Sequence, residues 1–444
     1  MRRLLPWLAL TCAQDAKPYY EVVFAVLTVP NHRPHRDAIR NGYGQPGGFR
    51  TKLWFVVSER DPGYEGAAFV EERSKRDDLL VCDTEPGFDH IIGKVSCAIR
   101  KAVQLYDFDF FFKTDDDATL CIAQLVKDLR AAPKGASVYA GRRVKAGRAL
   151  EAGKPLEVNL GLTSDPPHFG GHGYGVSYDV ARFVARPPAP LYHHLHEDTC
   201  FGNWVVGFDV KRLNLRAMTD HYYPNQKNLA GVSAERKRAC ARIMAQRYAN
   251  GSAWDLYGSG CGFKQLPRSV PVEKCVRVAS AAAAAAPRAR PALASVPALP
   301  SQGLAVVMTK GACAVDVPCV AGPDLRAGLR RTSAKHVVVV FGGNVAPCLS
   351  SLRKELEMRS GPLYAGAAPS RNVPLPASLE ERTKLGVAPE HFDGVAVLSA
   401  ELASYVASQA TPPLLAGDGP AALGVWLAPF DVDRRPLAAL RGCV

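Results

Sequence analysis

The stretch Phe108-Asp109-Phe110-Phe111-Phe112-Lys113-Thr114-Asp115-Asp116-Asp117-Ala118-Thr119-Leu120 sets an aromatic, strand-like run directly before three consecutive acidic residues. A helix-like segment follows from Ile122 to Arg130. Adjacent carboxylates repel one another unless a cation or solvent offsets their charge. Hard oxygen ligands at the carboxyl end of a buried strand suit Mg²⁺ or Mn²⁺ carrying a diphosphate. The same residues also fit a solvated acidic turn, because a DxD pattern is short and common.

Strand-like and helix-like segments alternate upstream of the acidic triplet. The runs Glu21 to Val29 and Lys52 to Ser58 are apolar, β-branched and of strand length. Helical patterns cover Ala67 to Arg76 and Ile91 to Leu105, and a short strand pattern covers Leu79 to Cys82. This alternation predicts an α/β sheet with a nucleotide site at the carboxyl edge of its strands.

The composition is that of a globular protein. The chain has 444 residues, enough for two or three domains, with 47% hydrophobic and 22% charged residues. The formal net charge is +13, which suits an anionic ligand. The Lys and Arg residues are scattered and no basic run contains interleaved aromatics, so nucleic-acid binding is not expected.

The N-terminal residues 1–16 have a basic tip, a short apolar run and small residues, as a secretory signal does. The run is shorter than the roughly 20 apolar residues that span a bilayer. We therefore expect the Golgi or the secretory-pathway lumen, with a type II membrane protein whose anchor is short or truncated as the alternative. Twelve cysteines and the glycosylation acceptor Asn250-Gly251-Ser252 point to the same oxidising compartment.

Three motifs follow the acidic triplet. In His168-Phe169-Gly170-Gly171-His172-Gly173-Tyr174-Gly175, four glycines allow a sharp turn or a close approach to a ligand. The segment lacks the context of a phosphate loop. The group His193-His194-Leu195-His196 is open to metal binding, although the nearby prolines favour a solvated turn. Glu197-Asp198 precedes a helical pattern, where Asp198 would be an N-cap.

The order of these pieces resembles the β-1,3-glycosyltransferase family, glycosyltransferase family 31, which includes β-1,3-galactosyltransferases, β-1,3-N-acetylglucosaminyltransferases and the Fringe proteins. The resemblance runs from about Glu21 to about Tyr223. It rests on Arg36-xxx-Ile39-Arg40, Trp54-Phe55-Val56-Val57, Glu72 with Asp78-Leu79-Leu80, Lys94, Phe112-Lys113-Thr114-Asp115-Asp116-Asp117, Gly171 to Ser177, and Glu197-Asp198 with Gly202. Each motif is short, and their shared order makes the match specific.

The resemblance implies a GT-A type α/β domain that binds a UDP-sugar. It places Asp115 and Asp117 around Mn²⁺ or Mg²⁺, with His221 as the candidate third ligand. It assigns Asp198 as the base that takes the proton of the acceptor hydroxyl in an inverting displacement. Two further groups of site residues are implied: Arg36, Arg40, Lys94 and Asp116 for donor binding, and Gly173, Tyr174 and Glu197 for the acceptor or the loop. The plain alternative for His221 is a surface histidine.

Two departures from the family pattern leave the donor sugar open. Asn41-Gly42-Tyr43 stands where relatives commonly carry Thr-Trp after the Ile-Arg pair. His90-Ile91-Ile92-Gly93-Lys94 stands where they carry Asn-Leu-Thr-Leu-Lys. These positions lie near the donor in relatives, so the sequence puts the sugar in doubt more than the class of reaction.

The C-terminal third resembles a decayed copy of what precedes it. Residues 276–303 are rich in Ala and Pro and predict a linker between a transferase domain at 17–275 and a second unit at 304–444. The matched segments are collinear: Phe201 to Arg212 with Leu423 to Arg434, Val176-Ser177 with Leu398-Ser399, Val138 to Gly141 with Leu363 to Gly366, and Cys121 to Leu129 with Cys348 to Leu356. We predict a degenerate partial repeat of the same fold. Chance similarity and an inaccurate gene fusion are the alternatives.

In this copy the acidic triplet aligns with Gly342-Gly343-Asn344, and Glu197-Asp198 aligns with Gly419-Pro420. The copy is therefore expected to be non-catalytic, with Val337 to Phe341 as its central strand. For the whole chain we expect a hexosyltransferase that moves galactose or N-acetylglucosamine from a UDP-sugar to a glycan or glycoprotein hydroxyl, in β-1,3 linkage by resemblance. The alternative is a catalytically inactive protein that binds glycan or UDP-sugar. A phosphoryl or nucleotidyl transferase is a weaker reading, because no Walker-type loop is present.

Overall fold

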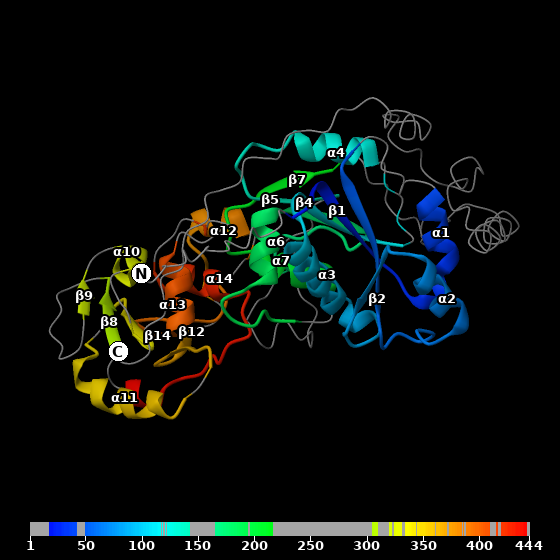
Figure 1. The fold of residues 1–444 in the computed structure, drawn as a ribbon. Helices are drawn as coiled ribbons and strands as arrows, with labels where there is room; N and C mark the ends of the chain where they lie inside the picture. The colour runs from blue at the N-terminus through cyan, green and yellow to red at the C-terminus, as the bar shows by residue number, and fades with distance from the viewer. Residues whose placement is uncertain are drawn as a thin grey trace, which may run out of the picture.

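The structure is a computed structural model, and it shows two α/β units side by side (Figure 1). The N-terminal unit is blue to green and the C-terminal unit is yellow to red. The described residues are 17–41, 49–116, 118, 120, 122–142, 165–193, 196–215, 304–309, 319–321, 324–330, 334–342, 344–359, 361–370, 373–383, 385, 388–408, 414–415 and 419–441. In this part of the chain no helix has the length and apolar character needed to cross a membrane.

The first unit is built on a seven-stranded sheet of order β3-β2-β1-β4-β6-β5-β7. Its strands are β1 (Tyr19–Leu27), β2 (Thr51–Ser58), β3 (Leu79–Cys82), β4 (Asp107–Asp115), β5 (Val138–Gly141), β6 (Gly173–Ser177) and β7 (Lys211–Asn214). Strands β3, β2, β1 and β4 are parallel, and β6 is antiparallel to both β4 and β5. The predicted strands at Glu21 to Val29 and Lys52 to Ser58 are present within two residues of their expected bounds.

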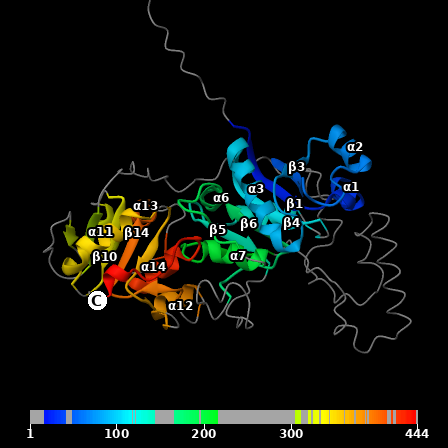
Figure 2. The same cartoon turned by 90° about the horizontal axis from the view of Figure 1, so that it is seen from below.

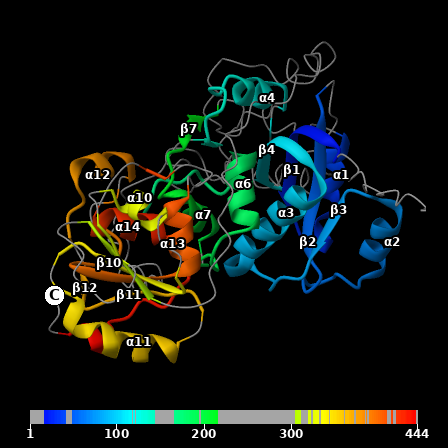
Figure 3. The same ribbon diagram turned by 60° about the vertical axis from the view of Figure 1, so that its left-hand side comes forward.

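Helices cover both faces of this sheet (Figure 3). They are η1 (Pro30–His32), α1 (Arg33–Asn41), α2 (Ala67–Lys75), η2 (Phe88–His90), α3 (Ile91–Leu105), α4 (Ile122–Arg130), α6 (Tyr178–Ala185) and α7 (Glu197–Val205). Helix α4 lies on one face, where Phe110 and Phe112 of β4 join its apolar core. Helices α3, α6 and α7 lie on the other face, where Phe111 is buried. Strand β4 is apolar on both sides because both of its faces are covered.

The second unit contains a five-stranded sheet of order β11-β14-β10-β8-β9 and a two-stranded sheet. Its strands are β8 (Leu304–Met308), β9 (Cys319–Ala321), β10 (His336–Val340), β11 (Tyr364–Gly366), β12 (Pro369–Ser370), β13 (His391–Phe392) and β14 (Val395–Ser399). Its helices are α10 (Leu325–Arg330), η6 (Ala346–Cys348), α11 (Leu349–Glu357), α12 (Ala377–Thr383), α13 (Ala400–Ala407), α14 (Pro420–Leu427) and η7 (Ala438–Leu440).

The five-stranded sheet has the order and strand directions of β5-β6-β4-β1-β2 in the first unit. Strand β14 is antiparallel to β10 and β11, as β6 is to β4 and β5. Strand β8 is parallel to β10 and β9, as β1 is to β4 and β2. The matched sequence segments begin only at α4 and its counterpart α11. The sheet order shows in addition that β8 and β9 take the places of β1 and β2.

The two units meet along α7 and α14, which lie close together in the views of Figures 2 and 3. On one side the Tyr192 amide donates to the Pro429 carbonyl, at 2.8 Å. On the other side the Leu415 amide donates to the Gly207 carbonyl, also at 2.8 Å. Apolar residues from both units form one continuous buried cluster around these contacts. The second unit is therefore packed on the first through a hydrophobic interface.

Candidate functional site

The carboxyl ends of β1 and β4 form the edge at which Asp115 and Asp116 of the acidic triplet lie. The two strands are parallel neighbours, and Leu27 pairs with Asp115. The Asp116 amide donates to the Leu27 carbonyl at 3.1 Å. Because parallel strands end at the same edge, the loop after β1 is brought together with Asp115 and Asp116 at the end of β4.

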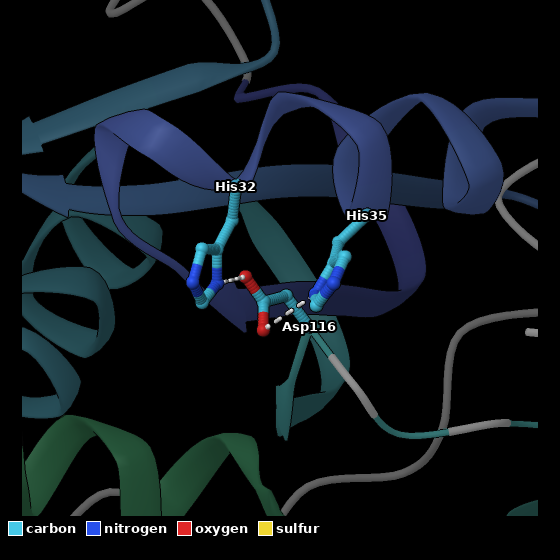
Figure 4. A group of neighbouring side chains, drawn as sticks. All are labelled: His32, His35 and Asp116. Carbon is cyan, nitrogen blue, oxygen red and sulfur yellow. Dashed lines mark hydrogen bonds and ion pairs between the residues drawn. The ribbon is translucent and has the colours of Figure 1, made fainter. Parts of the chain in front are cut away.

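Asp116 is the most enclosed carboxylate of the triplet among the described residues. Its Oδ2 accepts the Thr28 hydroxyl at 2.6 Å and lies 2.8 Å from His32 Nδ1, and its Oδ1 lies 3.5 Å from His35 Nδ1 (Figure 4). Burial alone would raise the pKa of this carboxyl, but the contacts with the two histidines and the hydroxyl hold it well below its usual range. Asp116 is therefore ionised at neutral pH.

Lys113 joins the triplet to the start of α7. This lysine is 1% exposed, and its Nζ lies 2.8 Å from Asp115 Oδ1 and 3.2 Å from Glu197 Oε2. It also donates to the Gly171 carbonyl. Burial lowers the pKa of a lysine, but the two carboxylates outweigh it and raise the pKa of Lys113 above its ordinary value. A buried ammonium thus connects two acidic groups that are more than 80 residues apart in the chain.

Glu197 is the buried partner in this arrangement. The Tyr174 hydroxyl donates to its Oε1, while Lys113 lies at its Oε2. Burial raises the pKa of Glu197 to about 7, against the opposing effect of Lys113. Gly173 and Tyr174 begin β6 and are both buried, so this side of the site is held by β6 and α7 together.

Asp198 lies in the first turn of α7 and is partly exposed. The N-cap of this helix is His196, so the sequence interpretation of Asp198 as the cap is wrong by two residues. The Asp198 Oδ1 accepts the Thr199 amide at 2.9 Å, and its Oδ2 lies 3.9 Å from Nε2 of the buried His168. A carboxylate at a helix N-terminus is favoured by the helix dipole. The Asp198 side chain is 21% exposed, so it reaches solvent next to Glu197, which Lys113 joins to Asp115.

Arg36, which was expected near the donor, is fully buried, and all its N–H groups donate hydrogen bonds to other groups of the domain. It donates twice to Glu72, at 2.6 and 3.0 Å. Its other N–H groups donate to the Thr28 hydroxyl and to the Val29 and Pro30 carbonyls. Since an arginine has five N–H donors, none remains for a ligand in this structure.

Arg40 and Lys94, the other two cations expected near the donor, are also used within the domain. Arg40 donates to Asp78 at 2.8 Å and to Glu72 at 2.7 Å. Lys94 donates to Asp61 at 2.6 Å. Both cations are buried, as are Glu72 and Asp61, and Asp78 is partly exposed, so these ion pairs hold α1 and α3 against the sheet edge in this structure.

The family model and the curated relatives agree on the type of domain. Residues 34–216 match the family model described as galactosyltransferase. This segment is a galactosyltransferase-family domain. A probable β-1,3-galactosyltransferase 4 of Arabidopsis thaliana is 28% identical over 226 residues, which cover 46% of this chain and 54% of that protein. A hydroxyproline O-galactosyltransferase of the same plant is 25% identical over 227 residues, which cover 48% of this chain and 67% of that protein.

The chain spans about half the length of the first curated relatives that it matches. A solved glucosyl-3-phosphoglycerate synthase from Mycobacterium tuberculosis, in complex with Mn²⁺, UDP and glucosyl-3-phosphoglycerate, is 12% identical with a TM-score of 0.29. That similarity covers 47% of this chain and 74% of that one. The family match and the strand order confirm the expected family and the α/β fold of GT-A type for the galactosyltransferase domain.

Of the three predicted metal ligands of the galactosyltransferase domain, Asp115 is among the described residues. Asp115 is a third exposed and lies beside Lys113. Asp117 and His221 lie outside the described residues. Within the described ranges, the group of at least three potential ligands is His32, His35 and Asp116.

Sequence reasoning missed His32, His35 and Lys113. The two histidines are three residues apart just after a strand that ends beside the triplet, and this spacing was the available signal. Lys113 is two residues before Asp115 on the same strand, so the two side chains share a face. At this sheet edge, His32, His35 and Asp116 offer ligand atoms for a cation, and Lys113 neutralises Asp115 and Glu197. The carboxylate of Asp198 is able to accept a proton.

Proposed function

We propose that the chain is a metal-dependent, inverting glycosyltransferase that moves galactose or N-acetylglucosamine from a UDP-sugar to a hydroxyl of a glycan or glycoprotein, in β-1,3 linkage. The observation that supports it best is the ammonium of Lys113, which lies between Asp115 and Glu197. Through it, Asp115 and the Glu197-Asp198 pair lie at one end of the galactosyltransferase domain. A transferase needs both groups, one beside the donor diphosphate and the other beside the acceptor.

Asp198 is the proposed general base. Its partly exposed carboxylate accepts the proton of the acceptor hydroxyl as that oxygen bonds to the anomeric carbon and the UDP oxygen leaves. Glu197, held by Lys113 and Tyr174, fixes the first turn of α7 and so the position of Asp198. Glu197 and Lys113 act as positioning residues in this account.

Asp115, Asp117 and His221 are the residues proposed to hold Mn²⁺ or Mg²⁺. Asp115 fits such an ion because it offers a partly exposed carboxylate oxygen at the sheet edge. When bound, the cation would offset the negative charge of the diphosphate. Arg36, Arg40 and Lys94 support donor binding indirectly, because their ion pairs shape the loop after β1.

The domain boundaries belong to the same proposal. Residues 17–275 form the catalytic domain, 276–303 the linker, and 304–444 a degenerate, non-catalytic copy that packs on it. Residues 1–16 direct the chain to the secretory pathway or the Golgi and give it any membrane association. The shared strand order of the two sheets supports the copy.

The direct test is UDP release by the full chain from a panel of UDP-sugars, with Mn²⁺ and β-linked acceptors. An EDTA control and the Asp198→Asn variant accompany it. We expect release with UDP-galactose or UDP-N-acetylglucosamine that requires both the metal and Asp198. No release with any donor, while UDP binding still depends on Mn²⁺, would overturn catalysis and favour the inactive binding protein.

A further inference from the structure

The loop between β1 and α1 brings two histidines against one carboxylate. His32 ends η1 and His35 lies in the first turn of α1, so both rings are on the same side of the chain. Their ring centroids are 4.8 Å apart. In Figure 4 each ring faces a different oxygen of Asp116. The three possible ligand atoms all lie within 4.8 Å of one another.

A buried framework orients this carboxylate from behind. The Thr28 hydroxyl donates to Asp116 Oδ2 at 2.6 Å and accepts an N–H of Arg36 at 3.2 Å. Arg36 is itself fixed by Glu72, at 2.6 Å. Metal sites in proteins commonly have such hydrogen-bonded partners behind their ligands, because these partners hold the ligand atoms in position.

The donor set selects a class of metal. Two imidazole nitrogens and one carboxylate oxygen suit Zn²⁺, Co²⁺ or Fe²⁺ and leave coordination positions open. For such ligands Zn²⁺ binds more tightly than Mn²⁺. We propose that His32, His35 and Asp116 bind a divalent transition-metal ion, with Zn²⁺ preferred over Mn²⁺.

The site is open on one side. The side chain of His32 is 46% exposed, against 19% for His35 and 9% for Asp116. An ion therefore enters past His32 and replaces the contact between that ring and the carboxylate. Asp115 is turned to Lys113 instead, so this site is distinct from the cation proposed for Asp115 and Asp117.

The test uses Co²⁺ as a spectroscopic probe in the full chain. Titration is followed by the visible d–d absorption of the bound ion in the wild type, His32→Gln, His35→Gln and the control His90→Gln, whose side chain is exposed at the end of η2. We expect each of the first two variants to weaken Co²⁺ binding by at least about tenfold, and the control to bind as the wild type does. Added Zn²⁺ should displace Co²⁺ at concentrations at which Mn²⁺ does not.

Three results would overturn the proposal: unchanged Co²⁺ affinity in both variants, equal loss in His90→Gln, or an intense thiolate-to-cobalt band showing that cysteines hold the ion. His32 is half exposed, so its replacement leaves the fold intact, which circular dichroism checks. The proposal does not depend on turnover. Asp198→Asn should retain the Co²⁺ titration whether or not the wild type releases UDP.

Discussion

The carboxyl ends of β4 and β10 occupy the same place in two sheets of the same topology, yet only one of them is acidic. Phe110 pairs with Ser177 in the first sheet, and His336 pairs with Ser399 in the second. This register aligns Asp115 and Asp116 with Phe341 and Gly342. The sequence alignment, which began at Gly342, is therefore shifted by one residue, because the second unit has one more residue before α11. Neither alignment places a carboxylate at the end of β10, so the second sheet forms without the acidic residues that a catalytic site would need.

Packing details of the two units correspond much more closely than their polar groups do. Tyr139 stacks edge-on against Phe169 with centroids 4.8 Å apart, and Tyr364 stacks likewise against Phe392 at 5.1 Å. His168 Nδ1 lies 2.8 Å from the Pro166 carbonyl, and His391 Nδ1 lies 2.9 Å from that of Pro389. The comparison shows that core contacts are sufficient for this strand order and that the acidic residues are not needed for it.

The largest expected difference between the units is catalytic. Asp198→Asn should lower the rate of UDP-sugar turnover by about 10²–10⁴-fold, the usual contribution of a general base. The corresponding position of the second unit is a proline, and Pro420→Ala should leave the rate unchanged. Steady-state assays of both variants check this. A comparable loss in both would mean that the second unit takes part in turnover.

The two interface tryptophans test whether the units unfold together. Trp204 and Trp426 are both fully buried, and each indole N–H donates to a backbone carbonyl, at 2.7 and 3.0 Å. Each Trp→Ala variant should lower the free energy of unfolding by about 3–5 kcal/mol. Because one apolar cluster joins the units, both should shift the same single transition in calorimetry. Two transitions, of which each variant moves only one, would contradict this.

Glu197 should give the first unit a pH dependence that the second lacks, since the corresponding residue there is Gly419. Its pKa is raised from 4.5 to about 7 by burial, so it stabilises the fold fully below pH 4.5 and loses this stabilisation as the pH rises to about 7. The shift corresponds to about 3 kcal/mol. Urea unfolding in EDTA should show a larger loss of stability over this range in the wild type than in Glu197→Gln. Equal losses would show that Glu197 does not titrate there.

The smallest expected effect is the loss of stability when a methyl group is added at Gly207, in the interface between the two units. A Cβ added to Gly207 would lie 3.0 Å from the Val425 carbonyl oxygen and 3.1 Å from Trp426 Cα. Backbone atoms cannot move aside easily, so Gly207→Ala should destabilise the protein by about 1–3 kcal/mol. Gly342→Ala is the control, because nothing lies within 4 Å of the added atom. Thermal unfolding of both variants tests this, and equal stabilities would show that the interface tolerates a methyl group.

The sequence predicted local structure well because the signals are local. Apolar runs located β1, β2 and β4, and the acidic triplet was correctly expected at the end of a strand. Strand β8 was not predicted, because it directly follows an Ala-rich segment that predicts a linker. Its place in the sheet depends on pairing with β10.

The parts of the site that the sequence did not predict depend on contacts between distant residues. Nothing near Arg36 indicates that its partner is Glu72, and nothing near Lys113 indicates Glu197. A cation in a family motif therefore suggested a ligand contact where the structure shows a buried ion pair. The same limit hid the meeting of His32 and Asp116, which are 84 residues apart.

The contact between the two units does not weaken when the protein is diluted, because both units belong to one chain. Leu191 of the first unit pairs with Phe430 of the second, and Phe208 of the first pairs with Leu414 of the second. Each unit therefore uses the same two kinds of segment in the contact, as the subunits of a symmetric dimer do. A dimer of separate chains dissociates when its concentration falls, whereas two halves of one chain remain at a high effective concentration. Helix α7, and Asp198 with it, is therefore supported by α14 equally well in a dilute compartment and in a crowded one.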